Sequence, residues 1–245
     1  MKIDKIYILA LNPDQARIDD IKRRLDDCEF DGPTPYEILY GHDGWNEPVP
    51  DWVTIYDGWQ LDTDNDFWKV PVQPGEVGCT ISHINAWKRA AEGEEERILI
   101  LEEDFVAEKT MSELPEPDAN WPFIWDYLTL GRWVFPSTKD IKIDDTFCIP
   151  GPHYNMQAYV LTKLGAQKLV DYKLEDNLFI NDEFIMATYM QHKRPDLNEL
   201  FPVKTINAIA THDDWFNQDG SSNKVSSHAP QWQPDARNDD PRKQQ

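Results

Sequence analysis

The sequence predicts an α/β fold, in which strands of a central sheet alternate with helices. The chain opens with a short apolar run at residues 6–11, followed by apolar side chains at helical spacing over residues 18–28. The segment 97–101, apolar throughout after Arg97, is typical of a parallel strand that is buried on both faces. A strand, an amphipathic helix and a further buried strand together are the pattern of an α/β domain.

The other elements of the first half follow from the same reasoning. Asn12 is expected to cap the first helix. Residues 36–40 predict the second strand, and segment 45–74, rich in Trp, Pro and Asp, predicts a long ordered loop. The second helix is expected to begin at Gly75 and to end in the acidic cluster 92–96.

The second half continues the alternation. Thr162 is expected to cap a third helix, because its side chain can accept a hydrogen bond from the first turn. The remaining expected elements are strands at 126–131, 154–161 and 203–210 and a helix at 181–191.

The length and the end of the sequence predict one domain and a tail. A chain of 245 residues is long enough to bury one sizeable core, and we expect it over residues 1–215. Residues 216–245 are dominated by Asn, Asp, Ser, Gln and Pro. Such a composition buries little apolar surface, so a polar and partly disordered tail is expected.

Charge and composition limit the classes of partner. With 45 acidic and 24 basic side chains the net charge is −21, which argues against nucleic acid or an anionic membrane as a partner. An anionic substrate would need a local cation, and a divalent metal ion is the obvious candidate. The sequence has no transmembrane run, no secretory signal and three scattered cysteines, so a cytoplasmic location is expected.

Three acidic residues directly after the buried strand give the strongest local signal. Ligands of α/β sheets bind beyond the carboxyl ends of strands, and alternation places Glu102 and Asp104 on one side of the chain. Two such carboxylates suit a hard divalent cation that holds a diphosphate. His212, beside a second pair of carboxylates, is a candidate third ligand of a manganese-like ion. The alternative is a solvated acidic loop with an ordinary surface histidine.

Another acidic pair, Asp182 and Glu183, opens the helix expected at 181–191. The helix dipole favours carboxylates in the first turn, so capping alone explains at least one of them. The functional alternative is a general base that takes the proton of a hydroxyl as it attacks a sugar carbon. The dense tryptophans of segment 45–74 are equally ambiguous, since aromatic faces stack on sugar rings and also anchor loops.

Several blocks of the sequence, taken together, resemble glycosyltransferase family 25. This family includes bacterial lipooligosaccharide galactosyltransferases and collagen hydroxylysine galactosyltransferases. The blocks follow the family order from about residue 6 to residue 215. They are 75–83 (similar to G-E-I-G-C-x-L-S-H), 101–105 (the acidic E-D-D segment), 125–132 (W-D-L-I-Y-L-G-R), 158–169 (A-Y-x-x-x-x-x-G-A-x-K-L), 182–184 (D-E-F) and 211–212 (the late T-H).

The resemblance implies a GT-A-like fold, with a mixed and mostly parallel central sheet flanked by helices. It also implies an inverting, metal-dependent transfer of a hexose, galactose or glucose, from a UDP-sugar to a hydroxyl of a glycan or protein. Glu102, Asp104 and His212 would hold Mn²⁺ or another divalent cation, and Asp182 or Glu183 would be the base. The expected donor-binding residues are Arg17, Gly75, Gly78, His83, Glu103 and Arg132.

Two departures from the family pattern leave other functions open. The family's first turn reads N-L-D-R-R-P-D-R, whereas the corresponding residues 10–17 securely keep only Arg17, and Glu103 replaces the middle acid of E-D-D. One alternative is a protein that binds a carbohydrate or nucleotide sugar without catalysis. The other is a metal-dependent hydrolase of nucleotide diphosphates, with water as the acceptor.

Overall fold

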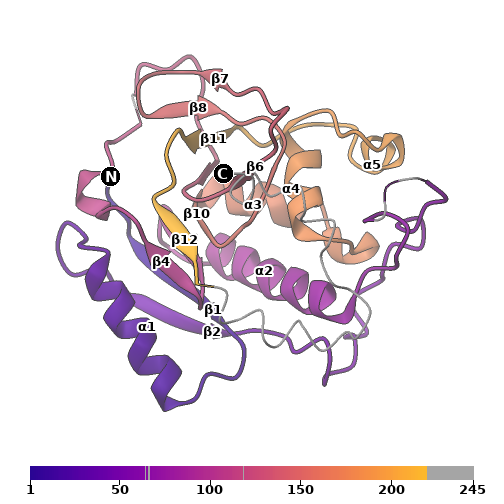
Figure 1. Cartoon of the computed structure of the whole chain (residues 1–245), viewed down its shortest axis with the longest axis horizontal. Coiled ribbons are helices and arrows are strands. Elements are labelled where there is room, and N and C mark those ends of the chain that lie inside the picture. The colour runs from indigo at the N-terminus through magenta and orange to yellow at the C-terminus, as the bar shows by residue number, and fades with distance from the viewer. Residues whose placement is uncertain (64, 66, 118, 220–245) are drawn as a thin grey trace.

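The computed structural model describes residues 1–63, 65, 67–117 and 119–219 (Figure 1). In the part of the chain it describes, no helix combines the length and the apolar character needed to cross a membrane. The helices are α1 (Gln15–Asp27), α2 (Pro74–Glu92), α3 (Lys163–Asp171), α4 (Asn181–Tyr189) and α5 (Pro195–Leu200), with 3-10 helices η1 (Met111–Glu113) and η2 (Leu174–Asn177). The strands are β1 (Lys5–Ala10), β2 (Tyr36–Tyr40), β3 (Arg97–Glu102), β4 (Phe105–Ala107), β5 (Tyr127–Thr129), β6 (Trp133–Val134), β7 (Ile141–Lys142), β8 (Phe147–Ile149), β9 (His153–Tyr154), β10 (Ala158–Thr162), β11 (Ala208–Thr211) and β12 (Phe216–Gln218).

The central sheet joins its strands in the order β2-β1-β3-β10-β5-β11-β8-β7. Strands β2, β1 and β3 pair in parallel, as do β5 and β11, while β10 runs antiparallel to both β3 and β5. Strand β8 is antiparallel to β11 and to β7, so β10 and β8 are the strands that run against the rest. This mixed, mostly parallel sheet confirms the predicted α/β class.

Helices cover both faces of the sheet because successive residues of a strand point to opposite sides. Tyr7 and Leu9 of β1 belong to a core that contains α2, α3 and α4. Ile6 and Ile8 belong to the other core, which contains the apolar face of α1. Figure 1 shows α1 apart from the group formed by α2, α3 and α4.

The first helix begins later than expected, and the prediction that Asn12 caps it was wrong. Asn12 takes a left-handed conformation with φ 47°, which an asparagine tolerates in a turn. Asp14 is the cap instead, and its carboxylate accepts the backbone N–H of Arg17 at 2.8 Å. The turn after β1 therefore runs two residues further before α1 starts. Thr162, by contrast, caps α3 as predicted, since its hydroxyl oxygen accepts the N–H of Gly165.

Three strand boundaries also differ from the prediction. The run 154–161 is divided into β9 and β10 by Asn155, whose φ of 76° interrupts an extended chain. The strand expected at 203–210 is confined to Ala208–Thr211. Beyond the expected domain boundary, Phe216–Gln218 forms β12 against β4. Most of the expected tail, residues 220–245, lies outside the described residues.

The tryptophan-rich segment 45–74 is held in place by Trp59, whose side chain is buried in the domain. Trp59 is 2% exposed and stacks on Phe179, with ring centroids 5.7 Å apart. The buried Arg194 guanidinium lies over the same indole and donates to the carbonyl oxygens of Trp59 at 2.7 Å and Gly58 at 2.8 Å. Trp59 is therefore a core residue, which fixes the loop that leads into α2.

Candidate active site

A pocket lies at the carboxyl ends of β1, β2 and β3. Strand β2 lies on one side of β1 and β3 lies on the other side. The connections after β1 and β3 therefore lead away in opposite directions, which opens a crevice between the ends of these two strands. The expected residues Gly75, His83, Glu102 and Glu103 all line this pocket. The other lining residues are Leu9, Ala10, Leu11, Gly41, His42, Asp43, Gly44, Trp45, Cys79 and Ser82.

Two glycines let the loop after β2 lie directly on the first turns of α2. A side chain at Gly44 would overlap the carbonyl oxygen of Pro74, and one at Gly78 would overlap that of His42. Gly78 therefore shapes the pocket by close backbone packing and does not itself line it. The loop is further fixed by Ser82, whose hydroxyl oxygen accepts the N–H of His42 at 2.9 Å.

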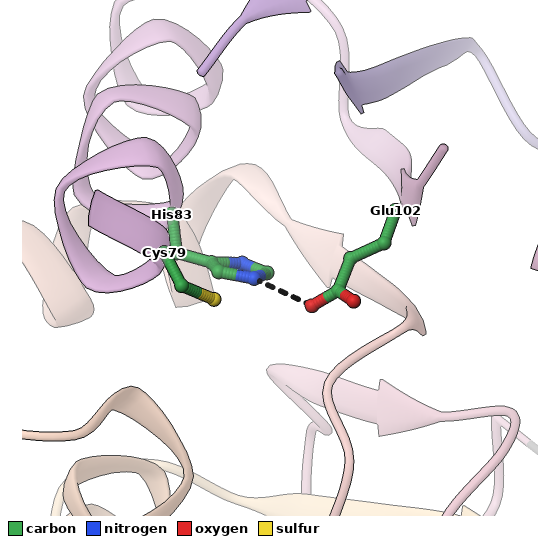
Figure 2. A group of neighbouring side chains, drawn as sticks. All are labelled: Cys79, His83 and Glu102. Atoms are coloured by element: carbon green, nitrogen blue, oxygen red, sulfur yellow. Dashed lines mark hydrogen bonds and ion pairs between the residues drawn. The ribbon is translucent and has the colours of Figure 1, made fainter. Parts of the chain in front are cut away.

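A hydrogen-bonded chain orients the Glu102 carboxylate at the end of β3. His83 Nε2 lies 3.2 Å from Glu102 Oε1 (Figure 2). On the other side of the ring, His83 Nδ1 lies 2.8 Å from the Tyr159 hydroxyl. Trp87 Nε1 donates to that hydroxyl oxygen at 2.9 Å, so the Tyr159 proton is directed to His83 Nδ1. The ring proton of a neutral His83 then lies on Nε2 and is donated to Glu102.

Cys79, His83 and Glu102 also form a group of three potential metal ligands, with ligand atoms within 4.8 Å of one another. A thiolate ligand suits a softer ion than manganese. Burial and then the Glu102 charge raise the pKa of the Cys79 thiol well above its usual value, whereas the thiolate is the form that binds metal. Within the group, the hydrogen bond to Glu102 comes from His83, while the Cys79 thiol donates to Asn181 Oδ1.

The second oxygen of Glu102 and the carboxylate of Asp104 meet at a common point. Gln218 of β12 places its Nε2 at 2.8 Å from Glu102 Oε2 and 3.5 Å from Asp104 Oδ1. Asp104 is fully buried, while the Glu102 side chain keeps 23% of its surface exposed. The sequence prediction that these two carboxylates share one side of the chain is therefore matched by their contact with one amide.

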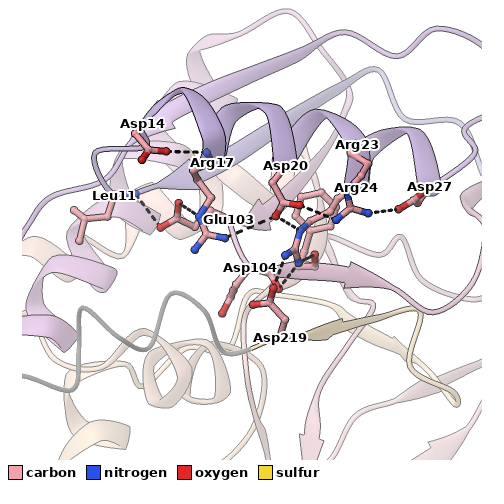
Figure 3. A network of polar contacts seen from close by, with 11 residues as sticks. Leu11, Asp14, Arg17, Asp20, Arg23, Arg24, Asp27, Glu103, Asp104 and Asp219 are labelled. Carbon is pink, nitrogen blue, oxygen red and sulfur yellow. Dashed lines mark hydrogen bonds and ion pairs between the residues drawn. The ribbon is translucent and has the colours of Figure 1, made fainter.

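Glu103 is held against the turn after β1 (Figure 3). Its Oε1 accepts the Leu11 N–H at 3.3 Å, and its Oε2 lies 3.3 Å from Arg17 Nε. Burial raises the pKa of Glu103, and the Arg17 charge opposes that change. Arg17 thus lies at the edge of the pocket through its ion pair with a lining residue.

Asp182 and Glu183 have different surroundings at the start of α4. Burial and then repulsion from the Glu102 carboxylate raise the pKa of Asp182 to about 7, while a hydrogen bond from the Asn155 backbone opposes the shift. Glu183 is buried behind it. Its Oε1 accepts the Tyr154 hydroxyl, and its Oε2 lies 2.5 Å from His192 Nε2. Burial and the Glu102 charge in the pocket therefore both raise the pKa of Asp182. The Glu183 carboxylate instead contacts Tyr154 and His192 inside the fold.

Comparison with protein families identifies the group to which these features belong. A family model described as glycosyltransferase family 25 (LPS biosynthesis protein) matches residues 3–186, well over half of the chain. The chain belongs to glycosyltransferase family 25. The matched stretch contains the pocket, the acidic end of β3 and the Asp182–Glu183 pair.

Curated members of glycosyltransferase family 25 are similar over parts of the chain. A glycosyltransferase 25 family member of Anopheles gambiae is 28% identical over 155 residues, 58% of this chain and 25% of that protein. Procollagen galactosyltransferase 1-B of Xenopus laevis is 24% identical over 224 residues, 86% of this chain and 35% of that protein. A probable inactive glycosyltransferase 25 family member 3 of Rattus norvegicus is 25% identical over 142 residues, 56% of this chain and 25% of that protein. The chain spans about a third or less of the length of these relatives.

Two residues expected at the glycosyltransferase site lie elsewhere in the structure. The Arg132 guanidinium donates two hydrogen bonds to the Asp140 carboxylate, from NH1 to Oδ1 at 3.0 Å and from NH2 to Oδ2 at 2.5 Å. Arg132 does not line the pocket. His212 Nε2 lies 2.9 Å from the carbonyl oxygen of Asp144 beside β8, and the side chain is exposed. Within the described residues, the three-residue ligand group does not include His212.

Some pocket residues were missed by sequence reasoning. His42 belongs to the loop directly after β2, and that position at a strand end was the available signal. Trp45, one of the tryptophans considered for stacking on a sugar, follows in the same loop and lines the pocket. His42 Nε2 and Trp45 Nε1 are buried without a hydrogen-bond partner among the described residues. Such atoms cost about 1–3 kcal/mol each, which favours a ligand that supplies the partner. Gln218 had no sequence signal, because it lies in a polar stretch that reads as tail.

Proposed function

We propose that this chain is an inverting glycosyltransferase that moves a hexose, galactose or glucose, from a UDP-sugar to a hydroxyl of a glycan or protein acceptor. Family membership supports sugar transfer. The pocket supports donor binding, because it lies at the strand ends where α/β sheets bind nucleotides. The observation that carries the proposal is the meeting of two carboxylates at this pocket: Glu102, which lines it, and Asp104 both contact one amide nitrogen.

Glu102 and Asp104 are the proposed holders of a divalent ion. Their donor atoms are oxygens, which suit manganese or magnesium, and both lie within 3.5 Å of one amide nitrogen. Bound there, a divalent ion would neutralise the donor diphosphate and stabilise the negative charge on the departing UDP. Glu103 and Arg17 would shape the edge of the same donor site, together with Gly75, Gly78 and His83.

Asp182 is the proposed general base. In a single displacement the acceptor oxygen bonds to the anomeric carbon, the bond from that carbon to the phosphate oxygen breaks, and the electron pair leaves with UDP. The acceptor proton then passes to Asp182. A pKa near the working pH suits a base, because the group is deprotonated often enough to accept and basic enough to attract the proton. Glu183 is already committed to Tyr154 and His192.

The test is UDP release from a panel of UDP- and GDP-sugars, with and without Mn²⁺ and with EDTA as a control. The proposal expects Mn²⁺-dependent release from a UDP-hexose, increased by a hydroxyl acceptor. Release that no added acceptor increases would favour a hydrolase, with water as the acceptor. Donor binding in calorimetry without release from any donor would favour a binding protein without catalysis.

A further inference from the structure

Strand β12 carries a side chain to the acidic end of β3 from a distant part of the sequence. It pairs antiparallel with β4, and Gln218 lies opposite Phe105, one residue after Asp104. The Asp219 N–H donates to the Asp104 carbonyl oxygen at 3.1 Å. Gln218 is thus held at a fixed register beside the carboxylates and is not the end of a loose segment.

Arg24 of α1 ties both strands of this small sheet to the domain (Figure 3). Its NH1 donates to the Phe105 carbonyl oxygen at 2.9 Å, and its NH2 pairs with the Asp219 carboxylate. The Arg24 side chain is only 11% exposed, so this anchor is largely protected from water. The contacts fix β4 and the end of β12 in place at the edge of the acidic site.

The Gln218 amide faces the two carboxylates that would hold a divalent ion. Its Nε2 donates to Glu102 Oε2 at 2.8 Å and lies 3.5 Å from Asp104 Oδ1, so one N–H₂ group faces both acids. A glutamine amide carries an acceptor oxygen beside this nitrogen, and a half-turn of the amide exchanges the two. With a divalent ion between the acids, the oxygen would be the favourable group to face it.

We propose that Gln218 is the third protein ligand of the divalent ion, through Oε1, with Glu102 and Asp104 as the other two. The inference rests on the proposed function of this site. In the structure the amide nitrogen faces the carboxylates, and a half-turn of the amide would present Oε1 to an ion instead. Amide oxygens are ordinary ligands of hard cations, so the set is all oxygen. Gln218 replaces His212, which lies beside Asp144, as the late residue of the sequence that completes the site.

The experiment is Mn²⁺ binding to the full chain, measured by calorimetry without donor or acceptor. Gln218→Ala should weaken the affinity by at least about 10-fold, the lower end of what is seen even when residues that only support metal ligands are changed. Gln218→Glu, which keeps an oxygen at the same reach, should bind at least as tightly as the native chain. Asn217→Ala is the matched control on the same strand and should leave the affinity unchanged.

The outcomes separate this inference from the proposed metal site. Asp104→Asn should abolish Mn²⁺ binding whether or not Gln218 is a ligand. If Asp104→Asn loses binding while Gln218→Ala keeps the native affinity, the inference is overturned and the proposed site stands. If Gln218→Ala and Asn217→Ala weaken binding equally, β12 acts only as a support, and the ligand role is again overturned. Native chain that binds no Mn²⁺ would overturn both.

Discussion

Two regions of the central sheet, its two arms, use charged residues in opposite ways. The first arm is the part formed by β1 and β3, and the second is the part formed by β11 and β8. At the ends of β1 and β3, carboxyl groups gather around a pocket, and the pKa values of Asp182 and Glu103 are raised by burial. Beside β11 and β8, Arg132 pairs with Asp140 and lowers the pKa of that carboxyl to about 2. In the first arm Arg17 offsets only part of the effect of burial on Glu103, whereas in the second arm Arg132 and a backbone hydrogen bond together outweigh the effect of burial on Asp140.

This difference distinguishes the proposed ligand site from a structural ion pair. An acid with a raised pKa favours a proton or a bound cation. An acid with a lowered pKa, such as Asp140, already has its counter-charge in the protein. This contrast supports the proposed ligand site at the ends of β1 and β3 and a structural role for the Arg132–Asp140 pair.

The largest effect is expected from Asp182→Asn. Loss of a general base typically costs 10²–10⁴-fold, so UDP release in the presence of acceptor should fall by about that factor. Donor affinity, measured by calorimetry, should stay near the native value because the base acts on the acceptor. Glu183→Gln is the neighbouring control, and its main effect should be a lower melting temperature, since it disturbs the contacts with Tyr154 and His192. The reverse result would exchange the two roles.

Arg132→Ala should cost stability and spare the donor site. The Arg132 side chain is 4% exposed, and its removal leaves the Asp140 carboxylate without its counter-charge. Breaking such a pair costs about 3 kcal/mol, the lower end of the usual range because Asp140 keeps some contact with water. Urea unfolding measures the loss, and Asp140→Asn should lower stability in the same direction. Native stability combined with weakened UDP-sugar affinity would instead assign Arg132 to the donor.

The pH dependence of turnover should follow Asp182. The base must be ionised, so kcat/KM should fall about 10-fold per pH unit below its pKa, with a midpoint at about 7 or lower where a bound cation offsets the Glu102 charge. Burial also makes this acid favour its protonated form in the fold. Its contribution to stability is therefore greatest below its unfolded pKa and is lost as pH rises through about 7. The Asp182→Asn variant should show neither dependence, and an unchanged profile in that variant would remove Asp182 as the titrating group.

Much of the fold was predictable because its strands and helices have apolar patterns that can be recognised within short stretches of sequence. The buried run of β3 and the helical spacing of α1 and α2 are each contained in one stretch of sequence, and strand-end carboxylates follow from them. Strand β12 was not predictable in this way. Three residues, Phe216–Gln218, become a strand only by pairing with β4, more than a hundred positions away. Gln218 therefore reaches the acidic site through a contact that composition and periodicity do not encode.

The same limit explains His212, from which the smallest effect is expected. A histidine after an apolar strand and before two acids fits a metal ligand by residue type, yet its ring lies beside the Asp144 carbonyl oxygen and is exposed. His212→Ala should change the free energy of unfolding by no more than about 0.5 kcal/mol, as expected for an exposed side chain. Calorimetry should give native Mn²⁺ affinity in the same variant. A clear loss of Mn²⁺ affinity would mean that both arms of the sheet contribute ligands to one metal ion, and the second arm would then not be purely structural.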